Sequence, residues 1–114
     1  MKNLYVADEK PVVCKVINSI MKDNGYEVKS TDCLHDLYKY CESNLPDVII
    51  VDGCIEGALD VIADIRQLPN GKIVRIIYSL VEADIKKMMA ARRAGASDYL
   101  LKPFDRSILL ELFG

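Results

Sequence analysis

The chain has 114 residues, enough for one domain with its own core, and its 51% hydrophobic and 28% charged residues are ordinary for a globular protein. A net charge of −2 gives the surface no general attraction for nucleic acid or anionic lipid, and no apolar run is long enough to span a membrane. The N-terminal segment lacks the pattern of a signal peptide, so we expect a cytoplasmic protein.

Apolar runs alternate with segments of helical periodicity along the whole chain. A short apolar run indicates a strand, whereas apolar residues three and four positions apart indicate a helix. In chain order, the predicted elements are a strand at 3–7, a helix at 13–21, a weaker strand at 26–30, a helix at 34–45, a strand at 47–52, a helix at 59–66, a strand at 73–79, a helix from 85 that ends at Gly95, a strand at 98–102 and a helix that begins near Ser107 and is cut short at Gly114.

Five strands that alternate with five helices predict an α/β fold of the (βα)5 type, a doubly wound, five-stranded parallel sheet with helices on both faces. In such a sheet, ligands bind beyond the carboxyl ends of the strands. Asp8 and Glu9 follow the first strand, while Asp52, Ser79 and Lys102 end the third, fourth and fifth. We therefore expect these five side chains to share one pocket.

Three carboxylates in one pocket would repel one another. Two such charges about 4 Å apart repel by roughly 4 kcal/mol at an effective dielectric constant of about 20. Mg²⁺ would relieve this repulsion, because it prefers carboxylates combined with phosphate oxygens and water. The ammonium of Lys102 and the hydroxyl of Ser79 could hold other phosphoryl oxygens, and Asp52 could be the nucleophile. The pattern indicates phosphoryl transfer onto Asp52.

Each of these residues also has an ordinary structural explanation. Asp8 and Glu9 stand at a predicted helix start, where the helix dipole favours acids. The Asp-Gly pair at 52–53 is typical of a hairpin turn, but the helical spacing that follows argues against a hairpin. Ser79 could be a turn residue and Lys102 a solvated charge. Their common position at one edge of the sheet favours a shared site.

The four cysteines do not have the spacing of a metal or redox site. No two of them are separated by only two residues, as zinc ligands and redox pairs often are. Cys14 and Cys41 fall on apolar helix faces, where a free cysteine behaves as a small hydrophobic residue. We expect buried or inert thiols at all four positions, Cys14, Cys33, Cys41 and Cys54.

Four features occur together in this chain: the acidic pair at 8–9, the strand DVIIVD at 47–52, Ser79, and the segment AGASDYLLKPF at 94–104. Together they resemble the receiver domain of two-component response regulators over nearly the whole length. The last segment is the most specific, because the family has a similar glycine-alanine, tyrosine and lysine-proline pattern. The resemblance implies a flavodoxin-like strand order, 2-1-3-4-5, in a receiver domain over residues 1–114.

The resemblance also implies a metal site beside the phosphorylation site. Asp52 would be the phosphoacceptor. Glu9, Asp52 and the backbone carbonyl of Cys54 would bind Mg²⁺, and Asp8 would hold a metal-bound water.

In the same family pattern, Lys102 would bind the phosphoryl group, Ser79 would move toward it, and Tyr99 would change rotamer as a switch. The donor would be a phosphohistidine on a sensor histidine kinase or a phosphotransfer protein. The domain would accept one phosphoryl group and could hydrolyse it, so we do not expect a conventional enzyme.

Three positions depart from the family pattern. The segment DGCIEGALD, residues 52–60, lacks the usual proline and is shorter than usual, which affects the loop that carries Cys54. Leu80 replaces a residue that is normally small, and it could slow phosphorylation, slow hydrolysis or shield the site. The interval from Ser79 to Lys102 is also longer than usual.

Phosphorylation would add negative charge and strong acceptor oxygens, which Ser79 and Lys102 can satisfy only by moving. We therefore expect the fourth strand, the segment 81–95 and the fifth strand to rearrange and to regulate an output domain or downstream protein. The same face, together with the last helix, could form a dimer. The basic residues of 81–95, which form either a solvated face or a partner surface, are Lys86, Lys87, Arg92 and Arg93. The chain has no nucleic-acid-binding motif.

Two alternatives remain open. A degenerate receiver would only bind other proteins and would not be phosphorylated. A flavin- or nucleotide-binding module of the same shape would need a phosphate-binding loop after the first strand, where this chain has the acidic segment ADEKP at 7–11. The short last helix leads us to expect a fragment of a longer regulator, although a stand-alone receiver is possible.

Overall fold

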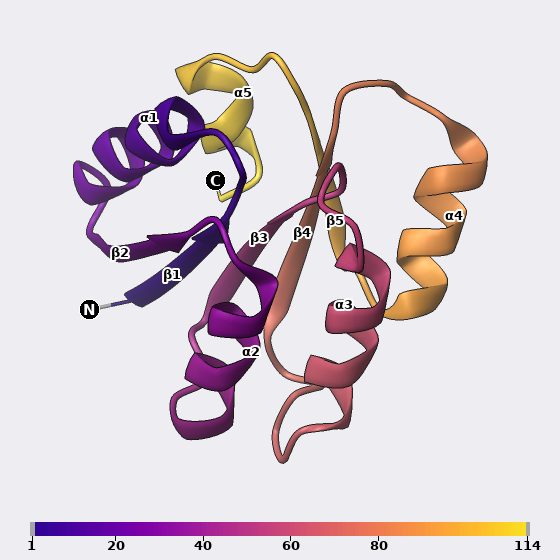
Figure 1. Cartoon of the computed structure of the whole chain (residues 1–114). Helices are drawn as coiled ribbons and strands as arrows, with labels where there is room; N and C mark the ends of the chain where they lie inside the picture. Colours follow the sequence, from indigo (N-terminus) through magenta and orange to yellow (C-terminus); the bar gives the residue numbers. More distant parts are fainter. Residues whose placement is uncertain (1, 114) are drawn as a thin grey trace.

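The computed structural model describes residues 2–113 (Figure 1). Met1, the start of the expected domain, and Gly114, where we expected the last helix to be cut short, lie outside the described residues. The elements are, in chain order, β1 (Lys2–Ala7), α1 (Pro11–Lys22), β2 (Tyr26–Thr31), α2 (Leu34–Ser43), β3 (Val48–Asp52), α3 (Ala58–Gln67), β4 (Arg75–Leu80), α4 (Ile85–Ala94), β5 (Asp98–Leu101) and α5 (Arg106–Glu111).

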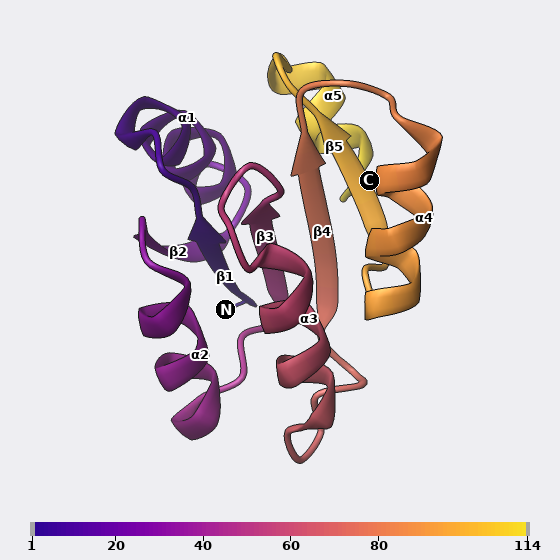
Figure 2. The same ribbon diagram turned by 45° about the vertical axis from the view of Figure 1, so that its right-hand side comes forward.

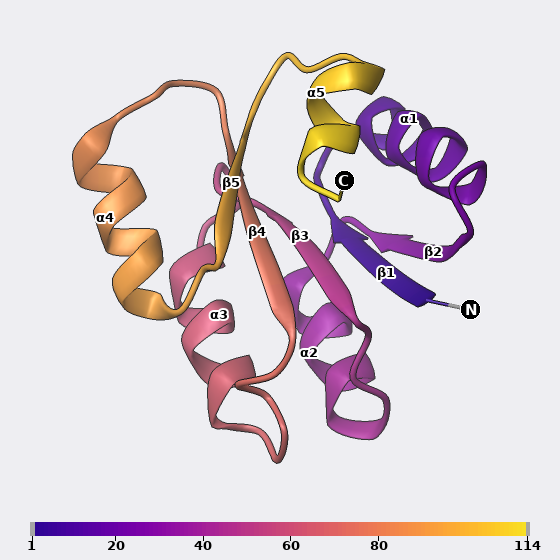
Figure 3. The ribbon, with the colours of Figure 1, turned by 180° about the vertical axis from the view of Figure 1, so that it is seen from behind.

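The five strands form one parallel sheet in the order β2-β1-β3-β4-β5. This confirms the predicted fold class and strand order. Helices α1 and α5 cover one face of the sheet, and α2, α3 and α4 cover the other, as the front and rear views show (Figures 1 and 3). None of the helices within residues 2–113 is long and apolar enough to cross a membrane.

Two hydrophobic clusters lie on opposite faces of the sheet. Strands β1, β3 and β4 contribute to both, because successive side chains of a strand point to opposite faces. Ile17 of α1 and Leu109 of α5 are fully buried in one cluster, and Ile62 and Ile65 of α3 are fully buried in the other. All of β3 is buried, as expected for a central strand of a covered parallel sheet.

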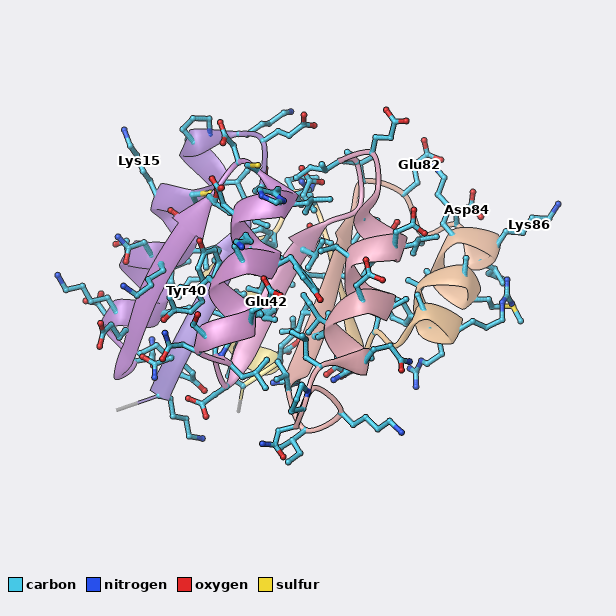
Figure 4. All side chains as sticks on the ribbon, turned by 60° about the horizontal axis from the view of Figure 1, so that its bottom comes forward. Lys15, Tyr40, Glu42, Glu82, Asp84 and Lys86 are labelled. Atoms are coloured by element: carbon cyan, nitrogen blue, oxygen red, sulfur yellow. The ribbon has the colours of Figure 1, made fainter. Side chains whose placement is uncertain are left out.

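The aromatic side chain of Tyr40 illustrates how α2 is attached to the sheet. Tyr40, labelled in Figure 4, packs on Tyr5 of β1 with 4.8 Å between the ring centroids. The helix ends at Ser43, two residues before the predicted end at Leu45, because Pro46 disfavours helical geometry in the residue before it. Cys41 of α2 and Cys14 of α1 are buried, as predicted.

Helix α4 packs less deeply than its sequence pattern predicts. Ile85 and Met89, apolar residues four positions apart in this helix, are 71% and 55% exposed. Ala91 is the one residue of α4 that is buried. The helix therefore contacts the core mainly through Ala91, with Met88 and Ala94 partly buried, while Ile85 and Met89 face outward.

The fourth strand also differs from its predicted bounds. It begins at Arg75 and ends at Leu80, whereas the prediction was 73–79. Ile73 is 80% exposed and follows a turn in which Asn70 has a φ of 64°. Ser79 is thus the penultimate residue of β4, and Leu80 belongs to the strand.

Candidate functional site

The carboxyl ends of β1, β3 and β5 bring Asp8, Asp52 and Lys102 together. The ammonium Nζ of Lys102 lies 3.1 Å from Asp8 Oδ2 and 3.2 Å from Asp52 Oδ1. Both carboxylate side chains are 3% exposed and the lysine side chain is 11% exposed. One largely buried cation is therefore shared by two buried anions, and it offsets only part of their charge and of their mutual repulsion.

Backbone N–H groups complete the surroundings of Asp52. Cys54 N–H donates to Oδ1 at 2.9 Å, and Glu9 N–H approaches Oδ2 at 3.4 Å. Burial alone would raise the pKa of Asp52, but the Cys54 N–H, Lys102 and the Glu9 N–H together hold this pKa below its ordinary value of 3.8. Asp52 is therefore ionised at neutral pH, as a nucleophilic carboxylate must be.

Lys102 responds to the same contacts in the opposite direction. Burial alone would lower the pKa of Lys102, but its hydrogen bonds and charge interactions with Asp8 and Asp52 raise it above 10.5. The side chain stays protonated through the physiological range. It can therefore donate to an added phosphoryl oxygen without first gaining a proton.

Asp52 and Lys102 open onto a cleft of about 560 Å³. Glu9 and Cys54 line the same cleft, together with apolar side chains of α1 and of the loops after β4 and β5. The apolar lining residues are Val12, Val13, Val16, Val81, Pro103 and Phe104. Val16 of α1 is 40% exposed because it lines this cleft.

Asp8 lies beside the cleft but faces a second, smaller hollow. That hollow has a volume of about 270 Å³ and is lined by Asp8, Cys14 and Ser30 among others. One carboxylate oxygen of Asp8 accepts from Lys10 N–H at 2.8 Å, which is a cap-like contact at the start of α1. The other oxygen meets Lys102. Asp8 thus supports the helix start and also contributes charge to the site.

The donor groups of the site suit a hard divalent cation. Within residues 2–113, no three histidine, cysteine or acidic side chains gather closely enough to enclose a metal. Mg²⁺ does not need such an enclosure, because it commonly keeps several waters and takes one or two carboxylates. The paired carboxylates of Asp8 and Asp52, with the exposed Glu9 at the rim, fit that requirement.

Ser79 is buried next to Asp52, but its hydroxyl is hydrogen-bonded to the backbone and is not directed into the cleft. The two residues are paired across β3 and β4, so their side chains share one face of the sheet. The Ser79 hydroxyl donates to the carbonyl of Val51 at 3.3 Å, and the side chain is 2% exposed. An interaction of Ser79 with a phosphoryl group therefore requires the hydroxyl to exchange this partner.

Leu80 does not shield the site, contrary to one of the effects considered for it. It follows Ser79 in an extended strand, so its side chain lies on the opposite face of the sheet. There it is 5% exposed and belongs to the cluster under α3 and α4. The bulk of Leu80 adds to the core and not to the wall of the cleft.

Tyr99 belongs to β5, and its side chain lies away from the cleft, against α4. Its hydroxyl donates to the carbonyl of Met88 in α4 at 2.6 Å, and the guanidinium of Arg92 lies 5.7 Å from the ring centroid.

The start of α4 is capped by Asp84, whose Oδ1 accepts from Lys86 N–H at 2.9 Å. Asp84 and Lys86 project from this end of the molecule in Figure 4.

Sequence reasoning missed the backbone donors to Asp52 and the apolar wall of the cleft. Backbone N–H groups carry no signal in side-chain identity, so the role of Cys54 N–H could not be read from the chain. The valines of α1 did carry a signal, because Val12 and Val16 are four positions apart, but that spacing is also typical of core residues.

Comparisons with known proteins agree on one family. The model of the response regulator receiver domain matches residues 4–113. The DNA-binding transcriptional regulator NtrC of Azospirillum brasilense is 31% identical over 112 residues, which cover 96% of this chain and 23% of that protein. An uncharacterized 14.6 kDa protein of Leptolyngbya boryana is 26% identical over 96% of this chain and 86% of its own length. The chain thus spans about a quarter of the length of its NtrC relatives.

Solved structures show the same fold. Chemotaxis protein CheY4 of Vibrio cholerae superposes with a TM-score of 0.93 at 22% identity, covering 99% of this chain and 96% of that one. The receiver domain of the sensor histidine kinase PA1611 of Pseudomonas aeruginosa has a TM-score of 0.84 at 26% identity, covering 97% and 93% of the two chains. That structure holds a magnesium ion coordinated in its active site cleft.

Proposed function

Because this chain belongs to the response regulator receiver domain family, we propose that it accepts a phosphoryl group on Asp52 and transmits the change to a partner. The observation that carries the proposal is the state of Asp52: a buried, ionised carboxylate beside Lys102 at the floor of an open cleft. A structural ion pair has no need of a cleft that gives access to it.

The transfer uses groups that are already in position. A carboxylate oxygen of Asp52 attacks the phosphorus, and the bond from phosphorus to the donor breaks, with the leaving imidazole of a phosphohistidine keeping the electron pair. Lys102 neutralises part of the charge on the phosphoryl oxygens, and Ser79 donates to one of them after it leaves the Val51 carbonyl.

The magnesium ion in the cleft of the PA1611 receiver supports Mg²⁺ as the metal, and we assign its ligands in this chain by their position at the site. Glu9, Asp52 and the carbonyl of Cys54 would hold Mg²⁺, with Asp8 binding a coordinated water. A bound Mg²⁺ supplies positive charge to the phosphoryl oxygens. The acidic rim argues against a phosphate-bearing flavin or nucleotide as the ligand, because the carboxylates would repel the phosphate of such a ligand.

The phosphoryl group would reach this chain from a sensor histidine kinase or a phosphotransfer protein, and the response would be read by an output domain or a separate protein. The face formed by β4, α4 and β5 supports this role, because α4 is held by few buried side chains. Exposed apolar residues on α4, β5 and α5 make the same region a candidate dimer surface; they are Ile85, Met89, Leu101 and Ile108.

Incubation with acetyl phosphate and Mg²⁺, followed by mass measurement of the intact protein, tests the proposal. We expect one added phosphoryl group on the wild type and none on Asp52→Asn. Asp60→Asn is the matched control, because Asp60 is an exposed carboxylate of α3 outside the cleft, and it should behave as the wild type does. A wild type that is never modified, even by a phosphohistidine donor, would instead identify a degenerate receiver that acts through protein contacts alone.

A further inference from the structure

Tyr78 has a large side chain with a phenol hydroxyl, and the end of its ring lies next to Gly53, the first residue of the loop that follows Asp52. It lies in β4 next to Ser79, is 5% exposed, and belongs to the cluster on the α3 and α4 side of the sheet. Its neighbours in register are Val51 of β3 and Tyr99 of β5. Nothing in the transfer described above uses this residue.

The end of the Tyr78 ring occupies the space where a side chain of Gly53 would be. A Cβ atom on Gly53 would lie 2.5 Å from Tyr78 Cζ, 2.6 Å from its hydroxyl oxygen and 2.7 Å from the carbonyl oxygen of Ser79. Only glycine permits such a close approach. Gly53 N–H also donates to that carbonyl at 2.7 Å, so Gly53 is held between the phenol and the backbone of β4.

The loop that rests on this contact controls a donor to Asp52. Residues 53–57 connect β3 to α3, and the loop passes close to the end of β4 (Figure 2). Cys54, the residue after Gly53, donates its N–H to Asp52 Oδ1, and Ile55 N–H donates to the Asp52 carbonyl at 3.2 Å. The position of Gly53 therefore limits where the Cys54 N–H can point.

We propose that Tyr78 is a positioning residue for Asp52: the end of its ring supports Gly53 and so holds the Cys54 N–H against the phosphoacceptor carboxylate. The loop contains no proline and has glycine at both ends, Gly53 and Gly57, so few of its own side chains restrict its backbone. A rigid aromatic ring on the neighbouring strand supplies what the loop lacks. The effect on phosphoryl transfer rests on the proposed function of Asp52, whereas the effect on the loop does not.

Two substitutions separate support of the loop from simple filling of the core. Tyr78→Phe keeps the ring and its contact at Cζ, so it should preserve loop geometry. Tyr78→Leu keeps an apolar side chain in the cluster but removes the end of the ring that meets Gly53. Ile76→Val is the control. Ile76 is fully buried in the same strand and cluster, but it is not among the residues that lie closest to Gly53.

Two readouts are needed: amide hydrogen exchange of Gly53 and Cys54 by NMR, and the rate of phosphorylation by acetyl phosphate at saturating Mg²⁺. In Tyr78→Leu we expect exchange at Cys54 to rise and phosphorylation to slow by about tenfold each, because misplacing a reacting group has effects of at least this size. Tyr78→Phe should stay within about twofold of the wild type on both readouts, since its ring keeps the geometry of the loop. Ile76→Val should leave Cys54 exchange unchanged relative to global unfolding.

Unchanged Cys54 exchange and an unchanged rate in Tyr78→Leu would overturn the inference, as would equal effects of Tyr78→Leu and Ile76→Val. If the wild type accepts no phosphoryl group, the proposed function fails, and the exchange measurement alone decides whether Tyr78 positions the loop. If Tyr78→Leu does not fold, Tyr78→Met, which better preserves volume, is judged by the same two readouts.

Discussion

At the scale of single residues, the most consequential contact is the one that Lys102 makes with two carboxylates. Its partners Asp8 and Asp52 are 94 and 50 positions away in the chain. All three side chains are nearly buried, so their charges are weakly screened by solvent. Removing the shared cation leaves two like charges with little exposure to water.

We therefore predict that Lys102→Met destabilises the domain in metal-free buffer by about 3 kcal/mol, the range found when one partner of a buried ion pair is removed. Urea unfolding measures the change. Adding Asp8→Asn to this variant, or adding Mg²⁺ to it, should recover part of the lost stability, because either change reduces the repulsion between the carboxylates of residues 8 and 52.

The control for this measurement is Lys39→Met. Lys39 pairs with Glu42 on α2 at 3.7 Å, but the two side chains are 65% and 43% exposed. Exposed pairs contribute little, so we expect a change within about 0.5 kcal/mol. Equal losses in the two variants would show that the contact of Lys102 with Asp8 and Asp52 is not a coupled buried pair.

At the scale of elements, α1 and α4 are attached to the sheet very differently. Four residues of α1 are buried, namely Cys14, Ile17, Ile20 and Met21, whereas α4 buries Ala91 alone. The hydroxyl of Tyr99 compensates in part through its hydrogen bond to the Met88 carbonyl. An element with so few buried contacts can move at a modest cost in free energy, which suits a switch.

Native-state hydrogen exchange should reveal this difference. We predict that amides of α4 exchange through local opening at a lower free energy than amides of α1. Tyr99→Phe removes a hydrogen bond worth about 1 kcal/mol and should speed exchange in α4 by about fivefold without changing α1. Uniform protection of the two helices would contradict the proposal that α4 is the mobile element.

At the scale of the whole molecule, the two clusters on opposite faces share the strands between them. A domain of this size is expected to unfold in a single cooperative transition, so one free energy of unfolding describes it. That free energy depends on pH through every group whose pKa changes on folding. Asp52 and Lys102 are two such groups with opposite signs.

The folded-state pKa of Asp52 is lowered, so its contribution to stability is present above its ordinary value of 3.8 and is lost as the pH falls through the folded value. The folded-state pKa of Lys102 is raised, so its contribution is present below 10.5 and is lost as the pH rises through the folded value. We predict that both contributions are intact near neutral pH.

Urea unfolding across acid pH, compared between the wild type and Asp52→Asn, tests the acid side. Wild-type stability should fall more steeply below about pH 4 than that of the variant, which has no carboxylate to protonate at residue 52. Parallel curves for the two proteins would mean that the contacts of Asp52 with Lys102 and Cys54 do not stabilise its charged form.

The amino-acid sequence alone was sufficient to predict the alternation of strands and helices, the parallel sheet and the edge of that sheet where Asp8, Asp52 and Lys102 meet. These follow from periodicity along the chain, because an element's type depends on which nearby residues are apolar. The strand order came from family resemblance and is confirmed. The roles of all the site residues remain predictions, namely those of Asp8, Glu9, Asp52, Cys54, Ser79, Tyr99 and Lys102.

The folded structure was needed to learn which groups touch. It placed Lys102 between two carboxylates, turned Leu80 away from the cleft, left Ile85 exposed and pressed Gly53 against Tyr78. Each of these depends on strand register and on the path of a loop, and both are set by packing between residues far apart in the chain. Local sequence patterns do not contain that information.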